Sequence, residues 1–166
     1  ELILEHLKDK SAMAIGPGLT TDPETVALVG ELLPLIKCPL VIDADALNAI
    51  STHKNWLDIL NPETVLTPHP KEMSRLMGLA TQKIQKNRIA TASQFAADHS
   101  LTLVLKGSPS LIAMADGTVI INPTGNAGMA TGGSGDVLTG IIAGLMAQGL
   151  PQASIAGSYI HGQAGD

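Results

Sequence analysis

The sequence predicts an α/β domain built on a largely parallel β-sheet. Short apolar runs alternate with helical patterns along the chain, which is the pattern of strands joined by crossover helices. Polar loops follow the ends of these runs, and a glycine-rich loop leads directly into an amphipathic helix. The length of 166 residues is that of one domain. With 45% hydrophobic and only 2% aromatic residues, its core is expected to be aliphatic.

The first part of the chain contains the predicted parallel strands, at residues 12–15, 40–42, 64–66 and 103–105. Asp22 precedes Pro23, which is the order of an N-cap followed by the first helical position. Thr81 is expected to cap a long helix that continues to about Ser100. The residues predicted to face inward from that helix are Ile84, Ile89, Ala92, Phe95 and Ala96.

The second part changes pattern, because two apolar runs at residues 111–114 and 118–121 flank Asp116-Gly117, a strong hairpin signal. An antiparallel pair is therefore expected. Two helices follow, the first with Val137, Leu138, Ile141, Ile142 and Leu145 on its apolar face and with Gly140 and Gly144 for close packing. The second runs from Gln152 to Asp166, with Ile155, Ala156, Tyr159 and Ile160 on one face.

Composition excludes several classes of function. The net charge of −5 argues against nonspecific binding to nucleic acid or to an anionic membrane. No signal peptide or membrane-length apolar run is apparent, so a soluble cytoplasmic protein is expected. The single cysteine, Cys38, cannot form a disulfide within the chain, and we expect it to be buried.

The glycine-rich loop at residues 122–136 predicts an anion site. A loop of this kind leaves free backbone N–H groups at the positive end of the next helix, where phosphate binds. Asp136 lies just inside that helix, so its carboxylate could take a proton from a hydroxyl that attacks phosphorus. The loop has neither the spacing of a Walker A motif nor that of a dinucleotide fingerprint. The alternative is a purely structural loop.

Four further polar loops follow predicted strands, at residues 16–20, 43–48, 67–72 and 106–110. Ligands bind along the carboxyl edge of an open parallel sheet, so these loops and the glycine-rich loop should meet at one crevice. Gly16 and Gly18 would let backbone approach a ligand, unless they form an ordinary turn.

The remaining candidates are charged or polar residues in these loops. Asp43 and Asp45 could hold Mg²⁺ through water, although Asp45 could instead cap a helix. His69 lies between two prolines and is expected to contact a ligand. Lys106 could meet a phosphate, the alternative being a solvated lysine.

The motifs at these positions resemble one family. They are Ala14-Ile15-Gly16-Pro17-Gly18, Val41 to Asn48 (VIDADALN), Leu66 to Glu72 (LTPHPKE), Val104-Leu105-Lys106-Gly107, Asn122 to Asp136 (NPTGNAGMATGGSGD) and His161 to Asp166 (HGQAGD). In this order they resemble the ADP/ATP-dependent NAD(P)H-hydrate dehydratases of the ribokinase-like superfamily. The resemblance implies a layered α/β/α fold with a largely parallel sheet and an antiparallel hairpin. Residues 1–166 would be a single domain, truncated at both ends and thus a fragment of a longer one.

The resemblance also implies a reaction, in which ADP or ATP phosphorylates the ring hydroxyl of hydrated NADH or NADPH and phosphate then leaves. The protein would be a hydro-lyase that uses Mg²⁺, with Asp136 as the catalytic base and a substrate contact. Gly16, Gly18 and His69 would contact the hydrate, and Glu72 is a candidate metal ligand. The implied nucleotide-binding residues are Lys106, Gly107, Ser108, Pro109, Ser110, Asn126 and Gly135. We also expect a homo-oligomer, fused to or working with an NAD(P)H-hydrate epimerase.

Two alternatives remain on sequence grounds. A vitamin or sugar kinase on the same fold would leave a stable phosphorylated product, although kinase relatives commonly have Asn where this chain has His69. A nucleotide-binding module without turnover would not need the carboxylate of Asp136.

Overall fold

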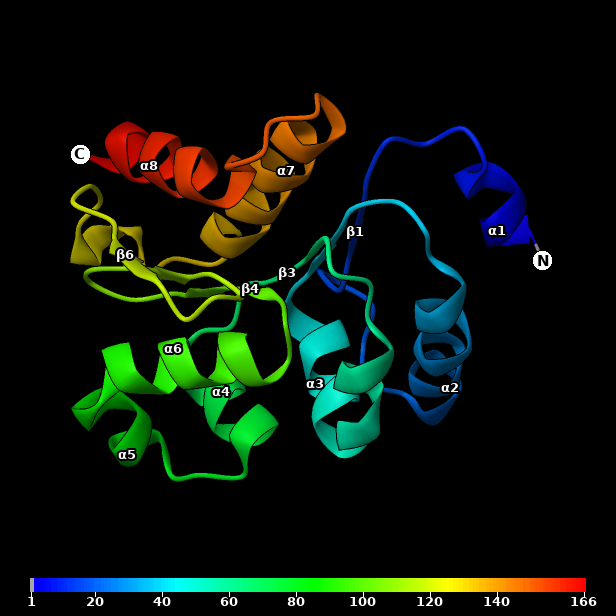
Figure 1. Cartoon of the computed structure of the whole chain (residues 1–166), viewed down its shortest axis with the longest axis horizontal. Helices are drawn as coiled ribbons and strands as arrows, with labels where there is room; N and C mark the ends of the chain where they lie inside the picture. The colour runs from blue at the N-terminus through cyan, green and yellow to red at the C-terminus, as the bar shows by residue number, and fades with distance from the viewer. Residues whose placement is uncertain (1) are drawn as a thin grey trace.

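The computed structural model describes residues 2–166 and contains one sheet of six strands in sequential order, β1 to β6 (Figure 1). The first four strands are parallel, and β5 and β6 are antiparallel, which confirms the predicted hairpin. The strands are β1 Met13–Ile15, β2 Leu40–Ile42, β3 Thr64–Leu66, β4 Thr102–Leu105, β5 Leu111–Ala113 and β6 Val119–Ile121.

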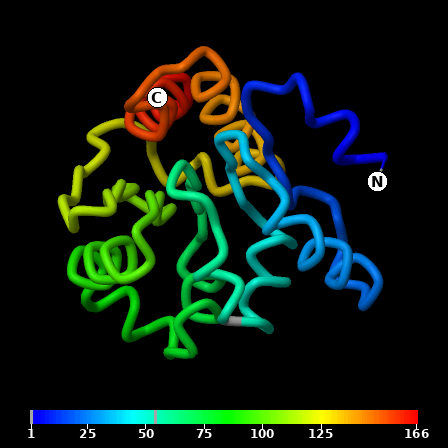
Figure 2. The backbone as a smooth tube through the Cα atoms, turned by 45° about the vertical axis from the view of Figure 1, so that its right-hand side comes forward, coloured from blue at the N-terminus to red at the C-terminus, as the bar shows by residue number. Residues whose placement is uncertain are grey.

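Helices cover both faces of the sheet, so the fold has the three layers that were expected. One face carries α2 Pro23–Leu32, α3 Ala44–Thr52, α4 Pro70–Met77, α5 Thr81–Lys86 and α6 Arg88–Asp98. The other face carries α7 Ser134–Ala147, with α8 Ala153–Gly165 packed beside it (Figures 1 and 2). A short helix, α1 Leu2–Leu7, precedes β1.

Alternation along the strands divides the core in two. In β2, Leu40 and Ile42 belong to the larger cluster, while Val41 faces α7. Successive side chains of a strand point to opposite faces, and here both faces are covered. The smaller cluster joins the sheet to α7 through Val41, Val65, Val104, Ile112, Leu138 and Ile142.

The prediction of one long helix from Thr81 to Ser100 is wrong, because the helix is interrupted at Asn87. Asn87 has φ −132° and ψ 42°, outside the helical region, so α5 ends before it and α6 begins after it. The N-cap of α5 is Ala80 rather than Thr81. In α6, Ala92, Phe95 and Ala96 are buried as predicted, whereas Ile89 is 53% exposed although it was predicted to face inward.

The contact between α7 and α8 also differs from the prediction. The buried face of α8 is made of small residues, Ala153, Ser154, Gly157, Ser158 and Gly162, while Tyr159 and Ile160 are exposed. A Cβ on Gly157 would lie 2.8 Å from Cγ1 of Ile142, so the helices approach closely at this glycine. In α7, Gly140 and Gly144 face open space and Val137 is exposed, contrary to expectation.

Among residues 2–166, no helix combines the length and the apolar character needed to cross a bilayer.

Candidate active site

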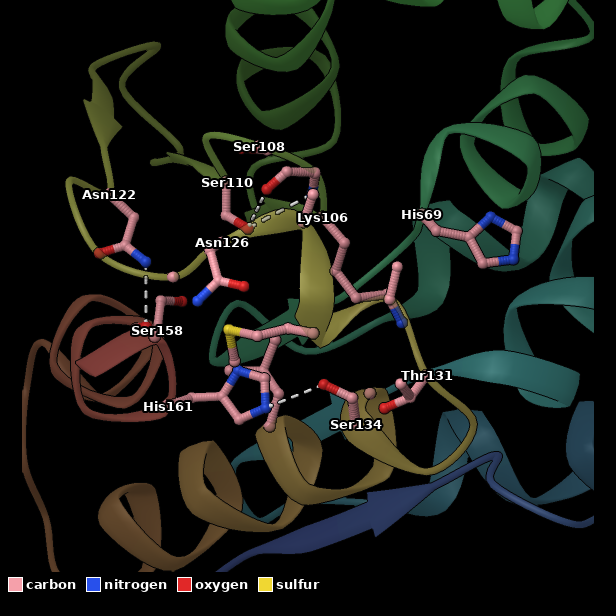
Figure 3. Close-up of a pocket in the computed structure, with 18 of the residues that line it drawn as sticks. His69, Lys106, Ser108, Ser110, Asn122, Asn126, Thr131, Ser134, Ser158 and His161 are labelled. Carbon is pink, nitrogen blue, oxygen red and sulfur yellow. Dashed lines mark hydrogen bonds between the residues drawn. The ribbon is translucent and has the colours of Figure 1, made fainter. Parts of the chain in front are cut away.

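A cavity of about 590 Å³ opens where the predicted loops meet, beside the ends of β2, β3 and β4 (Figure 3). It brings together His69, Lys106 and Asp136, from three separate parts of the chain. Of the other predicted site residues, it is lined by Glu72, Gly107, Ser108, Ser110, Asn126 and Gly135. The loops at 67–72, 106–110 and 125–136 therefore share one crevice.

Contrary to the expectation that all the polar loops meet at one crevice, the loop after β1 lies at a second cavity of about 430 Å³, lined mainly by apolar residues of β1, α1 and α2. Gly16 lines this second cavity, whereas Gly18 and Pro109 line neither of the two within residues 2–166. A Cβ on Gly16 would collide with the carbonyl oxygen of Asp43, so close backbone packing already requires glycine there. In the described part of the chain, Asp136 is the one residue common to both linings.

The glycine-rich loop leaves the N-terminus of α7 open. Its N-cap is Gly133, in the left-handed region at φ 86°, which has no side chain to cap the helix. The first backbone bonds run from Ser134 N–H to Thr131 O at 3.3 Å and from Val137 N–H to Gly133 O at 3.1 Å. Between them, the N–H groups of Gly135 and Asp136 have no acceptor within residues 2–166. Free N–H groups at the start of a helix, here one of 14 residues, can bind an anion.

The start of the loop is anchored to the end of α8. The carboxylate of Asp166 accepts hydrogen bonds from the Gly125 N–H at 2.9 Å and from Asn126 Nδ2 at 3.1 Å. These bonds lower the pKa of Asp166, that from Gly125 most strongly. Asn126 Nδ2 also donates to Gly165 O at 2.7 Å, and its Oδ1 accepts from Gly128 N–H at 2.9 Å. The side-chain amide of Asn126 is thus engaged within the protein.

The ammonium group of Lys106 is held in the cavity by a buried carboxylate. Asp43 is 1% exposed, and its Oδ1 lies 2.7 Å from Lys106 Nζ while its Oδ2 accepts from Thr139 Oγ1 at 2.8 Å. A Cβ on Gly135 would lie 3.2 Å from Lys106 Nζ, so the ammonium sits directly beneath the first turn of α7. Lys106 is therefore not the solvated lysine of the alternative interpretation.

The two aspartates after β2 do not act as a pair. Asp45 accepts from the Thr20 N–H at 3.0 Å and from Asn48 Nδ2 at 3.3 Å, so it fixes the loop after β1 instead of facing the first cavity. The N-cap position of α3 belongs to Asp43, whose side chain makes no capping bond. Sequence reasoning missed that Asp43 would pair with Lys106, although both follow buried strands.

His69 and Glu72 form a capping box at the start of α4. Nδ1 of His69 accepts from the N–H groups of Lys71 and Glu72, both at 3.1 Å, and Glu72 Oε2 accepts from the His69 N–H at 2.8 Å. Because Nδ1 is an acceptor, the ring proton resides on Nε2, 3.3 Å from Glu72 Oε1. Burial lowers the pKa of His69, outweighing the Glu72 carboxylate, and the Lys106 ammonium acts in the same direction as burial. His69 is therefore a neutral donor.

The charges of the cavity favour a further cation. Two buried carboxylates, Asp43 and Glu72, flank Lys106 at 2.7 Å and 3.9 Å, and Asp136 also lines the cavity, so the carboxylates outnumber this ammonium. Residues 2–166 contain no group of three His, Cys, Asp or Glu side chains arranged to hold a metal. Mg²⁺ does not need such a group, because it binds through one or two carboxylates together with phosphate oxygens and water.

The sequence was also compared with known proteins. A family model described as NAD(P)H-hydrate dehydratase matches residues 1–166. The chain is 54% identical over 166 residues to the bifunctional NAD(P)H-hydrate repair enzyme of Moorella thermoacetica, covering 99% of this chain and 31% of that protein. It therefore spans less than a third of that relative.

Solved structures show the same fold. The ADP/ATP-dependent NAD(P)H-hydrate dehydratase of Bacillus subtilis, co-crystallised with ATP and Mg²⁺, matches with a TM-score of 0.77 and 34% identity, over 96% of this chain and 58% of that one. A ribokinase-like superfamily protein of Enterococcus faecalis matches with a TM-score of 0.83 and 32% identity, over 97% and 56%.

Proposed function

The chain belongs to the NAD(P)H-hydrate dehydratase family, and from this we propose that the intact protein uses ADP or ATP to dehydrate hydrated NADH and NADPH. The single observation that carries the proposal is the position of Asp136. It stands at the open N-terminus of α7 and lines both the cavity with Lys106 and the cavity beside Gly16. A base between a phosphate site and a second binding site can serve a hydroxyl that attacks phosphorus.

The nucleotide would occupy the first cavity and supply the phosphoryl group. Its phosphates would meet the free N–H groups of Gly135 and Asp136 and the ammonium of Lys106. The absence of a Cβ at Gly135 keeps the space above Lys106 Nζ open. Ser108 and Ser110 line the same wall and would complete this site.

The hydrated nicotinamide would lie across Asp136, with His69 and the loop at Gly16 and Gly18 as further contacts. The Asp136 carboxylate would accept the proton of the ring hydroxyl as the hydroxyl oxygen bonds to the terminal phosphorus of the nucleotide. The bond between that phosphorus and the rest of the nucleotide breaks, so that ADP leaves AMP and ATP leaves ADP. Breakage of the carbon–oxygen bond then releases phosphate with the electron pair, and loss of a proton from the adjacent carbon restores the ring double bond. The Nε2–H of neutral His69 can donate a hydrogen bond to the substrate.

Glu72 and Asp43 would hold Mg²⁺, whose positive charge would offset the developing charge on the phosphates. These two carboxylates carry more negative charge than the Lys106 ammonium neutralises, and this remaining charge suits a bound Mg²⁺. We further propose a homo-oligomer that is fused to or works with an NAD(P)H-hydrate epimerase. The Moorella relative is named bifunctional, and this chain covers only 31% of it.

The test is incubation of the intact protein with hydrated NADH, ADP and Mg²⁺. We expect reduced-nicotinamide absorbance to recover while AMP and inorganic phosphate appear in equal amounts. A stable phosphorylated product would establish a kinase instead, and ADP binding without turnover would establish a binding module. Omitting ADP is the control, since spontaneous dehydration would not require it.

A further inference from the structure

The Lys106–Ser110 loop is held from behind by an arginine that does not line either cavity within residues 2–166. Nη2 of Arg88 donates to the carbonyl oxygens of Leu105 at 3.2 Å and Lys106 at 3.4 Å. Arg88 is the first residue of α6, directly after the break at Asn87. The interruption of the predicted long helix thus places this guanidinium under the end of β4.

Gly107 is shaped by the same side chain. A Cβ at this position would collide with Nη2 of Arg88 and lie 2.8 Å from its Cζ. The φ angle of 154° at Gly107 also disfavours any other residue. The absence of a side chain at Gly107 therefore makes room for the guanidinium on the side away from the nucleotide cavity.

The contacts of Arg88 bear directly on the direction of the Lys106 side chain. The Lys106 N–H donates to Pro68 O at 2.9 Å, and its carbonyl accepts from Arg88, so both of its backbone polar groups are fixed. With the backbone fixed, the side chain is directed to Asp43, 2.7 Å from Nζ.

Arg88 is held at an energetic cost. Its side chain is half-buried, burial lowers the pKa of the guanidinium, and its buried Nε has no partner among the described residues. A desolvated charge with an unpaired N–H donor destabilises the folded state unless the other hydrogen bonds of the same group compensate.

We propose that Arg88 is a positioning residue for the nucleotide site, which orients the Lys106–Ser110 loop and the Lys106 ammonium toward the phosphates. This inference rests on the proposed function, because it assumes that ADP or ATP binds at that loop. It acts through the loop and does not touch the nucleotide.

The experiment compares Arg88→Met with Lys86→Met in the intact protein. Lys86 is exposed and ends α5, so its variant makes the same change in charge two residues away. We expect Arg88→Met to weaken ADP binding, measured by calorimetry, about tenfold or more, the loss expected for hydrogen bonds made by a charged donor. Lys86→Met should leave the affinity within about twofold, since exposed charges contribute little.

Steady-state kinetics and thermal unfolding separate positioning from a structural role. In Arg88→Met the KM for ADP should rise, while the KM for the hydrate and kcat at saturating ADP change little. Should that variant fail to fold, Arg88→Lys keeps the charge on a shorter side chain without the guanidinium, and it should still bind ADP several-fold more weakly at an unchanged Tm. A lower Tm with normal ADP affinity would overturn the proposal.

The two proposals fail separately. If the wild-type protein binds ADP but restores no reduced nicotinamide, the dehydratase function is wrong, and the affinity of Arg88→Met still tests the positioning role. If both proteins bind ADP equally, the positioning role is wrong whatever the turnover.

Discussion

Replacing Asp43 by alanine removes a carboxylate that is 1% exposed and leaves the ammonium of Lys106 without its partner at 2.7 Å. Breaking a buried ion pair in this way costs about 3–5 kcal/mol. Lys106 keeps 19% exposure and has Glu72 Oε2 at 3.9 Å, so the lower end, about 3 kcal/mol, applies. The hydroxyl of Thr139 also loses its acceptor, which adds about 1 kcal/mol. We expect Asp43→Ala to lower the free energy of unfolding by about 4 kcal/mol.

Two companion variants divide this loss. Asp43→Asn keeps an acceptor for Thr139 but not the charge, so about 2–3 kcal/mol should be lost. Asp43→Asn combined with Lys106→Met removes both charges, and it should be more stable than Asp43→Asn alone because no buried charge is left unpaired.

Urea unfolding of the intact protein measures all three variants. The midpoint should shift while the slope stays constant, which shows that stability and not compactness has changed. Unchanged stability in Asp43→Ala, or a double variant that is no more stable than Asp43→Asn alone, would refute the argument that this pair is buried and coupled.

Three further predictions concern the site. Asp136→Asn should lower turnover by about 10²–10⁴-fold, the usual value of a general base, with ADP affinity retained; near-normal turnover at saturating substrate would move the base elsewhere. Gly135→Val should abolish ADP binding, read by calorimetry, because its Cβ would lie 3.2 Å from Lys106 Nζ; equal affinity in a folded variant would remove the anion site. The lowered pKa of His69 implies that its contribution to stability is complete above its ordinary value of 6.5 and is lost as pH falls through the lowered value. His69→Asn, which keeps a capping acceptor, should flatten that part of the Tm–pH curve, and an unchanged curve would assign the effect to another group.

The strands, the hairpin and the common crevice could be predicted because they depend on local patterns. Runs such as Leu40–Ile42 are apolar throughout since both faces of the sheet are covered, and Asp116-Gly117 determines a turn by itself. The carboxyl-edge rule then placed His69, Lys106 and Asp136 in one cavity.

The errors arose where contacts distant in sequence decide. The apolar pattern of residues 81–100 did not reveal the break at Asn87, whose consequence is a contact between Arg88 and the end of β4. In α8 the large residues suggested the buried face, but the close approach to α7 selected Gly157 and its small neighbours. The pairing of Asp43 with Lys106 depends on the order of strands, which no local pattern contains.

The anchoring of the glycine-rich loop by Asp166 has a consequence for the rate of nucleotide binding. Flexible glycine-rich segments lose much conformational entropy when they become ordered. Here the bonds from Gly125 and Asn126 to Asp166 order the start of the loop when the domain folds, before any ligand arrives. Association is then a docking onto a preorganised surface, whereas without this anchor each binding event would also have to restrict the loop.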